Sequence, residues 1–344
     1  MRRIHVGIIG VGWIGEIRAR VCAAHPLVES LHLAEIDPGK LARVARDTGA
    51  KTATADYREL LRRKDIDAIF VCTTPESTHY PIARDCLLAR RHTLLEKPIA
   101  IALKEADELI GLAREGRVKF TIGYTQRFNP KYAYVKQSLV NGTLGRPVTA
   151  LVSRNVSRSI GNKIGTRARL TPAVMEATHD LDFLLWCLDG VRPQTVYCQH
   201  VYRIMDEAHG VPDCSWIMVT MEDGTVFTVG AGWALPPGYQ HFSMATIEFI
   251  ATEGAVLIDD SHRDIILSTM GKGMVLPLST MPGEHVGHVY QGPMQAETIH
   301  FLEAVALDRP VLVTPEQARQ VMEVTLAADL SAERKQPVTL PLDP

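Results

Sequence analysis

The stretch Gly10-Val11-Gly12-Trp13-Ile14-Gly15 decides the fold of the first part of this chain. A strand-like apolar run (Ile4–Ile9) precedes it, and a helical pattern (Ile14–Ala24) follows it. The spacing G-x-G-x-x-G is weak on its own, but a strand before it and a helix after it are what a dinucleotide-binding turn requires. The three glycines then permit a tight turn, a close approach of the pyrophosphate and close packing of the helix, whose unpaired N–H groups face the phosphates. The residues expected to contact the cofactor here are Gly10, Gly12, Trp13, Ile14 and Gly15.

Strand-like and helix-like segments alternate over residues 1–123. The strand-like runs are Ile4–Ile9, Leu31–Ile36, Ala68–Cys72, Thr93–Glu96 and Phe120–Gly123, with a weaker one near Thr52. The helical patterns between them are Ile14–Ala24, Pro38–Thr48, Tyr57–Arg63, Pro81–Ala89 and Leu103–Glu115. This alternation predicts a parallel sheet with helices on both faces. Six strands suit the doubly wound Rossmann fold of dinucleotide-binding domains.

The pattern changes after Asn129. A helix (Lys131–Val140), a strand (Val148–Asn155), a polar loop and a helix (Pro172–Leu188) with Thr171 as its N-cap come first. Strand-like runs then follow one another without helices: Val196–Tyr202, Ser215–Met221, Val226–Gly232, Ala245–Ala251, Ala255–Asp259 and Ile265–Thr269. Asp223-Gly224 between two of them is a hairpin signal, and two late helices are expected at Ala296–Ala306 and Pro315–Ala332. The sequence therefore predicts a dinucleotide-binding Rossmann domain (1–123) and an α+β domain (124–344) with an open, mainly antiparallel sheet.

Composition excludes several other classes of protein. The chain has 344 residues, of which 46% are hydrophobic and 22% charged, with a formal net charge of -2. These are values of an ordinary globular protein, so neither a nucleic-acid partner nor a membrane partner is expected. Its six cysteines are scattered without a C-x-x-C pair, which favours buried, reduced thiols and a cytoplasmic location.

Asp37 is the acidic residue expected to bind the adenosine ribose. It follows the second strand, 22 residues after Gly15, and a carboxylate there would repel the 2′-phosphate of NADP. NAD is therefore favoured. Two alternatives stay open: Asp37 could serve only as the N-cap of the helix that starts at Pro38, and the nearby Lys40 and Arg43 leave NADP possible.

The triplet Glu96-Lys97-Pro98 lies at the carboxyl end of the fifth strand, where ligands bind in doubly wound sheets. Lys97 is therefore a catalytic candidate, and a cis bond before Pro98 would fix its direction. The alternative is a solvated charge before a turn. The second candidate is a helix face that carries Glu176, His179 and Asp182, because residues three or four apart share a face.

Hydride transfer from a hydroxylated carbon needs a base for the hydroxyl proton, and an imidazole suits that role near neutral pH. We assign the base to His179, hydrogen bonding of the same oxygen to Lys97, and orientation of His179 or substrate binding to Asp182. A swap of the first two roles stays open. Arg167 belongs to a basic loop that could hold an acidic substrate group, although such loops more often face water. No metal site is expected, since His285 and His288 lack further ligands.

Further motifs match in order along the chain: Thr74-Pro75 with His79, Arg127-Phe128-Asn129-Pro130, His179-Asp180-Leu181-Asp182 and Val338-Thr339-Leu340-Pro341. With the glycine loop and Glu96-Lys97-Pro98, the chain resembles the glucose–fructose oxidoreductase / inositol dehydrogenase / MocA (Gfo/Idh/MocA) family over nearly its whole length. The resemblance implies Lys97 and His179 as the catalytic pair, NAD(P) as cofactor, and a sugar, cyclitol or related hydroxylated substrate. It also implies an NAD-binding domain over 1–123, a substrate-binding and oligomerisation domain over 124–344, and a homodimer or homotetramer formed through the open sheet. It also implies cofactor contacts at Thr73, Thr74, Pro75, His79, Glu96, Lys97 and Arg127, and substrate contacts at Lys97, Arg127, His179 and Tyr290.

One departure from the family concerns the residue four before the histidine, which many members have as aspartate. Here Met175 stands at that place and Glu176 follows it. One step along an α-helix rotates a side chain by about 100°, so Glu176 either compensates through its longer side chain or only packs beside the site.

Three functions are compatible with these features. The first is an NAD-dependent dehydrogenase that oxidises a secondary hydroxyl and releases NADH. The second is an enzyme that retains NAD and uses transient oxidation for elimination, hydrolysis or epimerisation. The third is an NAD-binding sensor without turnover, which would need neither Lys97 nor His179.

Overall fold

The computed structural model describes residues 2–166, 169–236, 239, 243–260, 267–271, 273–275, 283–287 and 289–343. By its internal contacts the chain divides into two compact units, Met1–Phe128 with Thr280–Arg319, and Asn129–Ser279 with Gln320–Pro344. This division differs from the expected limits (1–123 and 124–344) because Thr280–Arg319 groups with the first unit.

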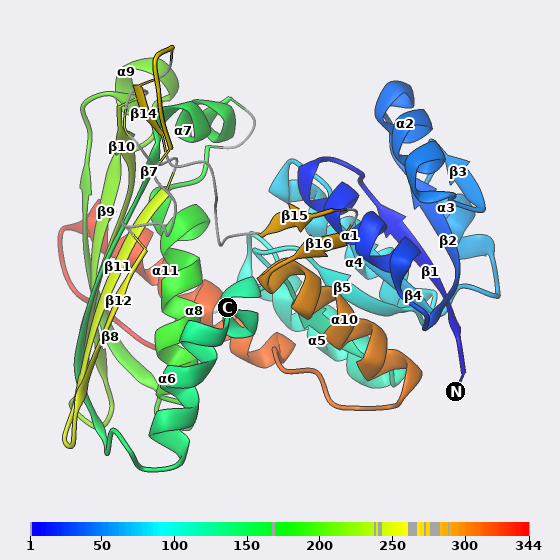
Figure 1. Cartoon of the computed structure of the whole chain (residues 1–344). Coiled ribbons are helices and arrows are strands. Elements are labelled where there is room, and N and C mark those ends of the chain that lie inside the picture. Colours follow the sequence, from blue (N-terminus) through cyan, green and yellow to red (C-terminus); the bar gives the residue numbers. More distant parts are fainter. Residues whose placement is uncertain are drawn as a thin grey trace. The chain divides into compact units, whose positions relative to one another are not determined.

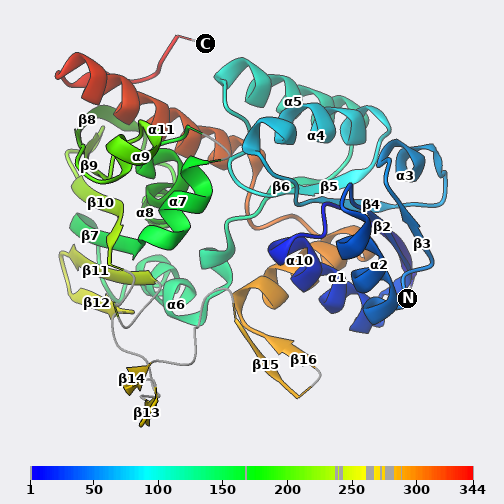
Figure 2. The same cartoon turned by 90° about the horizontal axis from the view of Figure 1, so that it is seen from above.

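The first unit has a six-stranded parallel sheet in the order β3-β2-β1-β4-β5-β6, as expected for a Rossmann fold. Its strands are β1(Ile4–Ile9), β2(Val28–Ala34), β3(Thr52–Thr54), β4(Ala68–Val71), β5(His92–Leu95) and β6(Phe120–Ile122). Its helices are α1(Trp13–Ala24), α2(Pro38–Thr48), α3(Arg58–Arg62), α4(His79–Leu88), α5(Leu103–Gly116) and α10(Pro293–Ala306), with short 3-10 turns at η1(Glu76–Thr78) and η2(Thr125–Phe128). Helices α1, α2 and α10 lie on one face of the sheet and α4 and α5 on the other (Figures 1 and 2).

Helix α10 returns to the first unit from far along the chain. Its Phe301 and Leu302 are fully buried in the core that strands β1 and β4 form. The ring of Phe301 packs edge-on against that of Phe70, with the ring centroids 5.1 Å apart. This apolar contact is the physical reason why the segment groups with the Rossmann sheet.

The second unit has a seven-stranded sheet in the order β12-β11-β7-β10-β9-β8-β17. Neighbouring strands are antiparallel except β7 and β10, so the expected open, mainly antiparallel sheet is confirmed. The strands are β7(Pro147–Ser157), β8(Pro193–Val201), β9(Cys214–Met221), β10(Val226–Leu235), β11(Ser243–Ala251), β12(Ala255–Asp259) and β17(Val338–Thr339). The hairpin at Asp223-Gly224 is also confirmed, with Gly224 at φ 87°.

Helices of the second unit lie along one face of this sheet (Figure 2). They are α6(Pro130–Val140), α7(Arg158–Gly165), the π-helical turn η3(Ala173–Ala177), α8(Thr178–Cys187), α9(Met205–His209) and the later part of α11(Pro315–Arg334). Two small hairpins complete the described chain, β13(Leu267–Thr269) with β14(Gly273–Val275), and β15(Glu284–Val286) with β16(Val289–Gln291). No helix in the described part of the chain is long and apolar enough to span a membrane.

Two short helices were not predicted. Helix α7 replaces part of the expected polar loop, where the side chain of Ser157 accepts a hydrogen bond from the backbone N–H of Ser159 and caps the helix. Helix α9 ends at Gly210, which has φ 66°. Neither helix is long enough for its apolar spacing to stand out from the sequence around it.

Candidate cofactor-binding and catalytic site

The glycine loop after β1 has the shape that a pyrophosphate needs. Gly10 has φ +84°, and a Cβ there would lie 2.7 Å from the carbonyl oxygen of Cys72. A Cβ at Gly15 would lie 1.9 Å from the carbonyl oxygen of Gly10, so α1 can approach the loop only with glycine at this position. A Cβ at Gly12 would have no atom within 4 Å, and no side chain caps α1 there. The loop therefore leaves open backbone N–H groups at a helix N-terminus, which fits a dinucleotide phosphate.

Glu35 lies against this loop, and the sequence analysis missed it. Its Oε2 accepts a hydrogen bond from the N–H of Val11 at 2.8 Å, and its Oε1 accepts one from the N–H of Asp37 at 3.0 Å. Glu35 directly follows β2 and stands 20 residues after Gly15. The sequence signal was therefore present, because an acidic residue about 20 residues beyond the loop is the usual ribose ligand.

Asp37 has a different position from the one expected. Its Oδ1 accepts hydrogen bonds from the backbone N–H groups of Gly39 (2.9 Å) and Lys40 (3.0 Å), which makes it the N-cap of α2. The bond from the Lys40 backbone is the main cause that lowers the pKa of Asp37. The alternative left open by the sequence, a helix cap, is thus what the structure contains, and a ribose contact by Asp37 stays a prediction.

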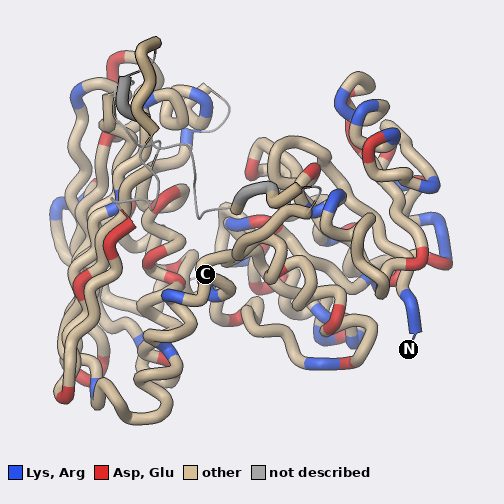
Figure 3. Tube along the Cα trace, in the orientation of Figure 1, with Lys and Arg blue, Asp and Glu red and all other residues tan. Residues whose placement is uncertain are grey.

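The basic residues that left NADP possible are paired with carboxylates. Arg43 donates two hydrogen bonds to Glu16, at 2.7 and 2.6 Å, and these bonds are the main cause that lowers the pKa of Glu16 to about 2. Lys40 lies 3.5 Å from the carboxylate of Asp37. Acidic and basic residues accordingly lie side by side along α2 (Figure 3). A 2′-phosphate would have to compete with these carboxylates for the two cations.

The predicted cis bond between Lys97 and Pro98 is present, at the carboxyl end of β5. Lys97 is half-buried. The carboxylate of Glu96 accepts hydrogen bonds from Nε (2.8 Å) and Nη2 (2.6 Å) of Arg18. Lys97 thus follows a residue whose side chain is held by a buried guanidinium.

His79 joins two turns at this edge of the sheet. Its Nδ1 lies 2.8 Å from the carbonyl oxygen of Pro98, and its Nε2 lies 3.0 Å from that of Thr73. The side chain is only 1% exposed. The structure therefore gives His79 a bracing position between the Thr73-Thr74-Pro75 turn and the Lys97-Pro98 turn, and direct cofactor contact by His79 and by these turn residues stays a prediction.

The predicted catalytic helix of the second unit begins with a π-helical turn, η3, which the sequence analysis did not foresee. A π-turn closes its hydrogen bonds over one more residue than an α-turn and often occurs at functional sites. The turn contains both Met175, which stands where many family members have an aspartate, and Glu176, the carboxylate one residue later. Oε1 of Glu176 accepts a hydrogen bond from the indole N–H of the buried Trp233 at 3.0 Å.

The acidic residues around His179 differ in accessibility. His179 and Glu176 are half-buried, whereas Asp180 and Asp182 are fully buried. Asp180 forms a buried ion pair with Arg154, with hydrogen bonds of 2.5 and 2.8 Å. Asp182 is therefore less accessible than His179, and its role in orienting His179 or binding substrate stays a prediction.

Three further residues are predicted to contact the cofactor or the substrate. Arg127 is 2% exposed and donates hydrogen bonds to the side chain of Gln317 (2.7 Å) and the carbonyl of Leu312 (3.3 Å), which hold it in the first unit. Its contact with cofactor or substrate stays a prediction. Tyr290 is packed into the first unit against α1, in a cluster with Ile17 and Val21. Arg167 lies outside the described residues.

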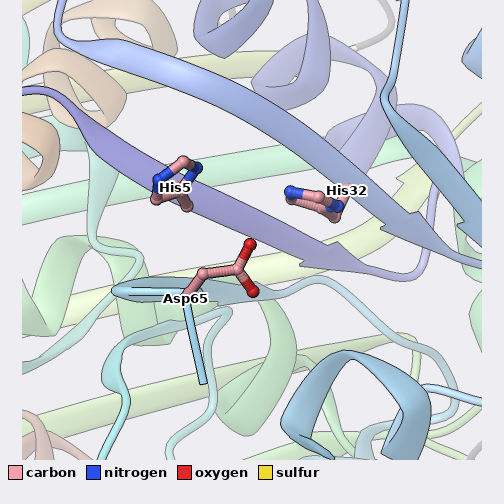
Figure 4. Close-up of side chains that lie close together, drawn as sticks. All are labelled: His5, His32 and Asp65. Atoms are coloured by element: carbon pink, nitrogen blue, oxygen red, sulfur yellow. The ribbon is translucent and has the colours of Figure 1, made fainter. Parts of the chain in front are cut away.

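His5, His32 and Asp65 face one another at the amino-terminal edge of the Rossmann sheet, with candidate ligand atoms within 4.8 Å (Figure 4). Both rings hydrogen-bond to the hydroxyl of Ser30, at 2.7 and 2.8 Å. Arg63 lies 2.7 Å from the carboxylate of Asp65, and burial, followed by the Arg63 charge, lowers the pKa of His32 to about 4. The hydrogen bonds through Ser30 and the ion pair between Arg63 and Asp65 already explain why these three side chains lie together. The absence of a metal site stays a prediction.

Comparisons with known proteins agree with both halves of the chain. A family model described as "Oxidoreductase family, NAD-binding Rossmann fold" (GFO_IDH_MocA) matches residues 4–124, and a "GFO/IDH/MocA C-terminal domain" model matches residues 132–257. The chain is similar to UDP-N-acetylglucosamine 3-dehydrogenase of Acidithiobacillus ferrooxidans (26% identity, 97% of this chain and 98% of that protein). It is also similar to myo-inositol 2-dehydrogenase of Thermotoga maritima (22% identity, 98% of each chain).

The fold is shared with solved structures. A scyllo-inositol dehydrogenase from Lactobacillus casei with bound NAD(H) and scyllo-inositol superposes with a TM-score of 0.84, at 21% identity over 98% of this chain and 99% of that chain. GenD2 from gentamicin A biosynthesis, in complex with NAD, superposes with a TM-score of 0.84, at 23% identity over 99% of this chain and 97% of that chain.

Proposed function

The chain belongs to the Gfo/Idh/MocA family of oxidoreductases with an NAD-binding Rossmann fold, and from this premise we propose that it oxidises a secondary hydroxyl of a sugar, a cyclitol or a related cyclic polyol. The observation that carries the proposal is the pairing of an open glycine loop with Lys97 at the carboxyl edge of one parallel sheet. The names of the similar dehydrogenases support the class of substrate.

Several residues would hold the cofactor. The N–H groups from Gly12 to Gly15 would bind the pyrophosphate, since those of Gly10 and Val11 are already bonded to Ala34 and Glu35. The carboxylate of Glu35 would accept hydrogen bonds from the ribose hydroxyls. When bound, NAD supplies the acceptor for the hydride that leaves the hydroxylated carbon. Because Arg43 and Lys40 are already paired with acidic residues, NAD is favoured over NADP.

Lys97 and His179 would handle the substrate hydroxyl. The Lys97 ammonium donates a hydrogen bond to the hydroxyl oxygen and stabilises negative charge that develops on it. The imidazole of His179 takes the hydroxyl proton as the carbon loses its hydride, so the product is a ketone. The open alternative is that Lys97 carries the proton and His179 donates the hydrogen bond.

In this proposal Glu176 and Asp182 act indirectly, by holding the helix that carries His179. Trp233 holds the Glu176 carboxylate, so this residue is suited to fix the start of the catalytic helix. Asp182 is fully buried and is suited to orient the helix that carries His179.

A cofactor and substrate panel tests the proposed function. Purified protein is mixed with NAD or, separately, with NADP, and reduced nicotinamide is followed by absorbance with cyclitols, aldoses, uronates and cyclic dihydrodiols. We expect steady NADH formation with at least one cyclic polyol and a clear preference for NAD. If NAD binds and no compound gives NADH, the dehydrogenase proposal fails, and an enzyme that retains NAD or a sensor takes its place.

We also propose that two copies of the chain associate through the sheet face of the second unit opposite its helices. Exposed apolar side chains lie on neighbouring strands of this face: Leu151, Trp216, Met218, Ile250 and Leu257. The ring of Trp216 lies over Gly230, where an added Cβ would be 2.5 Å from it. Glu248 lies between Leu151 and Leu257 on this face, but exposed apolar side chains gathered on neighbouring strands are typical of a protein–protein interface.

A charge on this face should separate the copies. We expect the variant Leu151→Glu/Trp216→Glu to have half or less of the native mass in light scattering, since the carboxylates would have to be buried without partners. The control is Tyr134→Glu, which changes an exposed aromatic residue on α6 (69% exposed) and should keep the native mass. An unchanged mass in the double variant would place the interface elsewhere.

A cytoplasmic location remains part of the proposal. It is supported by the six cysteines, which all lie in the described part of the chain, form no disulfide with one another and, except for Cys214, are buried. Cell fractionation would test it.

A further inference from the structure

A buried ion cluster in the first unit includes Glu96, the residue that precedes Lys97. Arg18, from α1, is fully buried. Its Nη2 donates to Oε1 of Glu96 at 2.6 Å and to Oε2 of Glu297 at 2.6 Å, so one guanidinium nitrogen serves two carboxylates. The cluster thereby links α1, the residue before Lys97, and α10, which is 279 residues away from Arg18.

The surroundings leave this cluster little freedom. Thr125 donates to Oε2 of Glu297 at 3.1 Å, and Nη1 of Arg18 donates to Oγ1 of Thr298 at 3.1 Å. The backbone at Gly123 lies against this cluster. A Cβ there would lie 2.8 Å from Oε2 of Glu96 and 3.2 Å from Nη2 of Arg18, so a larger residue would push on both side chains. The Glu96 carboxylate is therefore held by Arg18 and confined by the backbone at Gly123.

The charge balance in the cluster is unfavourable to a second carboxylate. The charged and titratable groups that face Glu297 are Arg18, Glu96 and, more distantly, the buried thiol of Cys72. Burial is the main cause that raises the pKa of Glu297 to about 7, and Arg18 opposes it. Oε1 of Glu297 is buried and has no hydrogen-bond partner among the described residues. A glutamate at this position therefore costs the fold stability, which a residue needed only for packing would not do.

We propose that Glu297 is a positioning residue for Lys97: through Arg18 it fixes the carboxylate of Glu96 and thereby the turn from which Lys97 projects. The inference rests on the proposed role of Lys97 in oxidation. Glu297 itself touches neither cofactor nor substrate in this role.

The first test is Glu297→Gln, which keeps the shape and removes the charge. We expect kcat to fall about 10-fold, because a neutral amide holds Arg18 less strongly than a carboxylate does, while the dissociation constant for NADH stays within about twofold. The matched control is Glu303→Gln on the same helix, whose ion pair with Arg309 is exposed and whose loss should leave kcat unchanged.

The dependence on pH separates positioning from a purely structural role. Glu297 is ionised in the native protein above its pKa of about 7, so the ratio of native to Gln-variant kcat should be largest near pH 8.5 and approach 1 near pH 6, whatever else titrates in both. Because the folded-state pKa is raised above the unfolded one, native stability falls relative to the variant as pH rises from about 4.5 to about 7. The Gln variant should thus melt no lower than the native protein at neutral pH.

A second variant and a readout without turnover complete the test. Gly123→Ala pushes on Glu96 and Arg18 without changing charge, and we expect the same fall in kcat with little change in NADH binding. In both variants, competitive acylation followed by mass spectrometry should show an altered reactivity of Lys97 but not of the exposed Lys104. Unchanged Lys97 reactivity, or a ratio of kcat that stays at 1 over the pH range, would overturn the inference. Altered reactivity in a protein that oxidises no polyol would instead overturn the proposed function alone.

Discussion

Replacement of Lys97 by methionine should lower kcat by about 10³-fold and leave the dissociation constant for NADH within about threefold. Methionine has nearly the same length as lysine but provides no hydrogen bond to the substrate oxygen and no charge to stabilise it. Lys97 is half-buried at the carboxyl edge of the sheet, on a turn held by Arg18 and His79, so the substitution should leave the fold intact. The measurement is steady-state oxidation of the best compound from the panel, together with NADH titration.

Lys104→Met is the control for this prediction, because Lys104 is an exposed lysine at the start of α5 in the same unit. It should keep full activity. A companion variant, His179→Asn, should lose about 10²-fold or more in kcat if His179 is the base. Near-native kcat in Lys97→Met would exclude Lys97 from the chemistry and reduce it to the solvated charge that the sequence left open.

Replacement of Glu35 by glutamine should raise the preference for NADP over NAD, expressed as the ratio of kcat/KM values, by about 10²-fold. Glutamine can still accept the hydrogen bond from the N–H of Val11, so the glycine loop should keep its shape. It lacks the negative charge that repels a 2′-phosphate and binds ribose hydroxyls less strongly. The measurement is kcat/KM for both cofactors at a saturating substrate concentration.

Asp37→Ala decides between the two acidic residues. The structure predicts that this variant keeps its cofactor preference within about threefold and loses the stability that an N-cap gives its helix. The melting temperature should fall by a few degrees accordingly. If Asp37→Ala changes the cofactor ratio and Glu35→Gln does not, the original prediction for Asp37 is right, and Glu35 only braces the loop.

Much of the architecture could be predicted because its signals are local. The glycine spacing, the alternation of strands and helices, and Asp223-Gly224 each lie within a few neighbouring residues, and the structure has a six-stranded parallel sheet and a mixed, mainly antiparallel sheet accordingly. The π-turn η3 and the helices α7 and α9 were missed because their patterns are too short or deviate from the α-helical period.

The candidate site was predictable in part. Lys97 and its cis-proline turn follow from the position of Glu96-Lys97-Pro98 after a strand. The choice between Glu35 and Asp37 did not follow, because both residues are acidic and stand at plausible distances from Gly15. Only the direction of each side chain separates a loop contact from a helix cap.

The sequence by itself determined that this chain has a dinucleotide-binding loop, a lysine at the ligand-binding edge of a parallel sheet and a helix with a histidine among carboxylates. Each of these is a short-range pattern, fixed by backbone sterics and hydrogen bonding within a few residues. Tertiary structure alone decided that α10 packs on the Rossmann sheet and that Arg18 joins Glu96 to Glu297. Such contacts join residues hundreds of positions apart and depend on which helix faces and sheet faces pack together to bury their apolar side chains. The local periodicity of the sequence does not show which faces will meet.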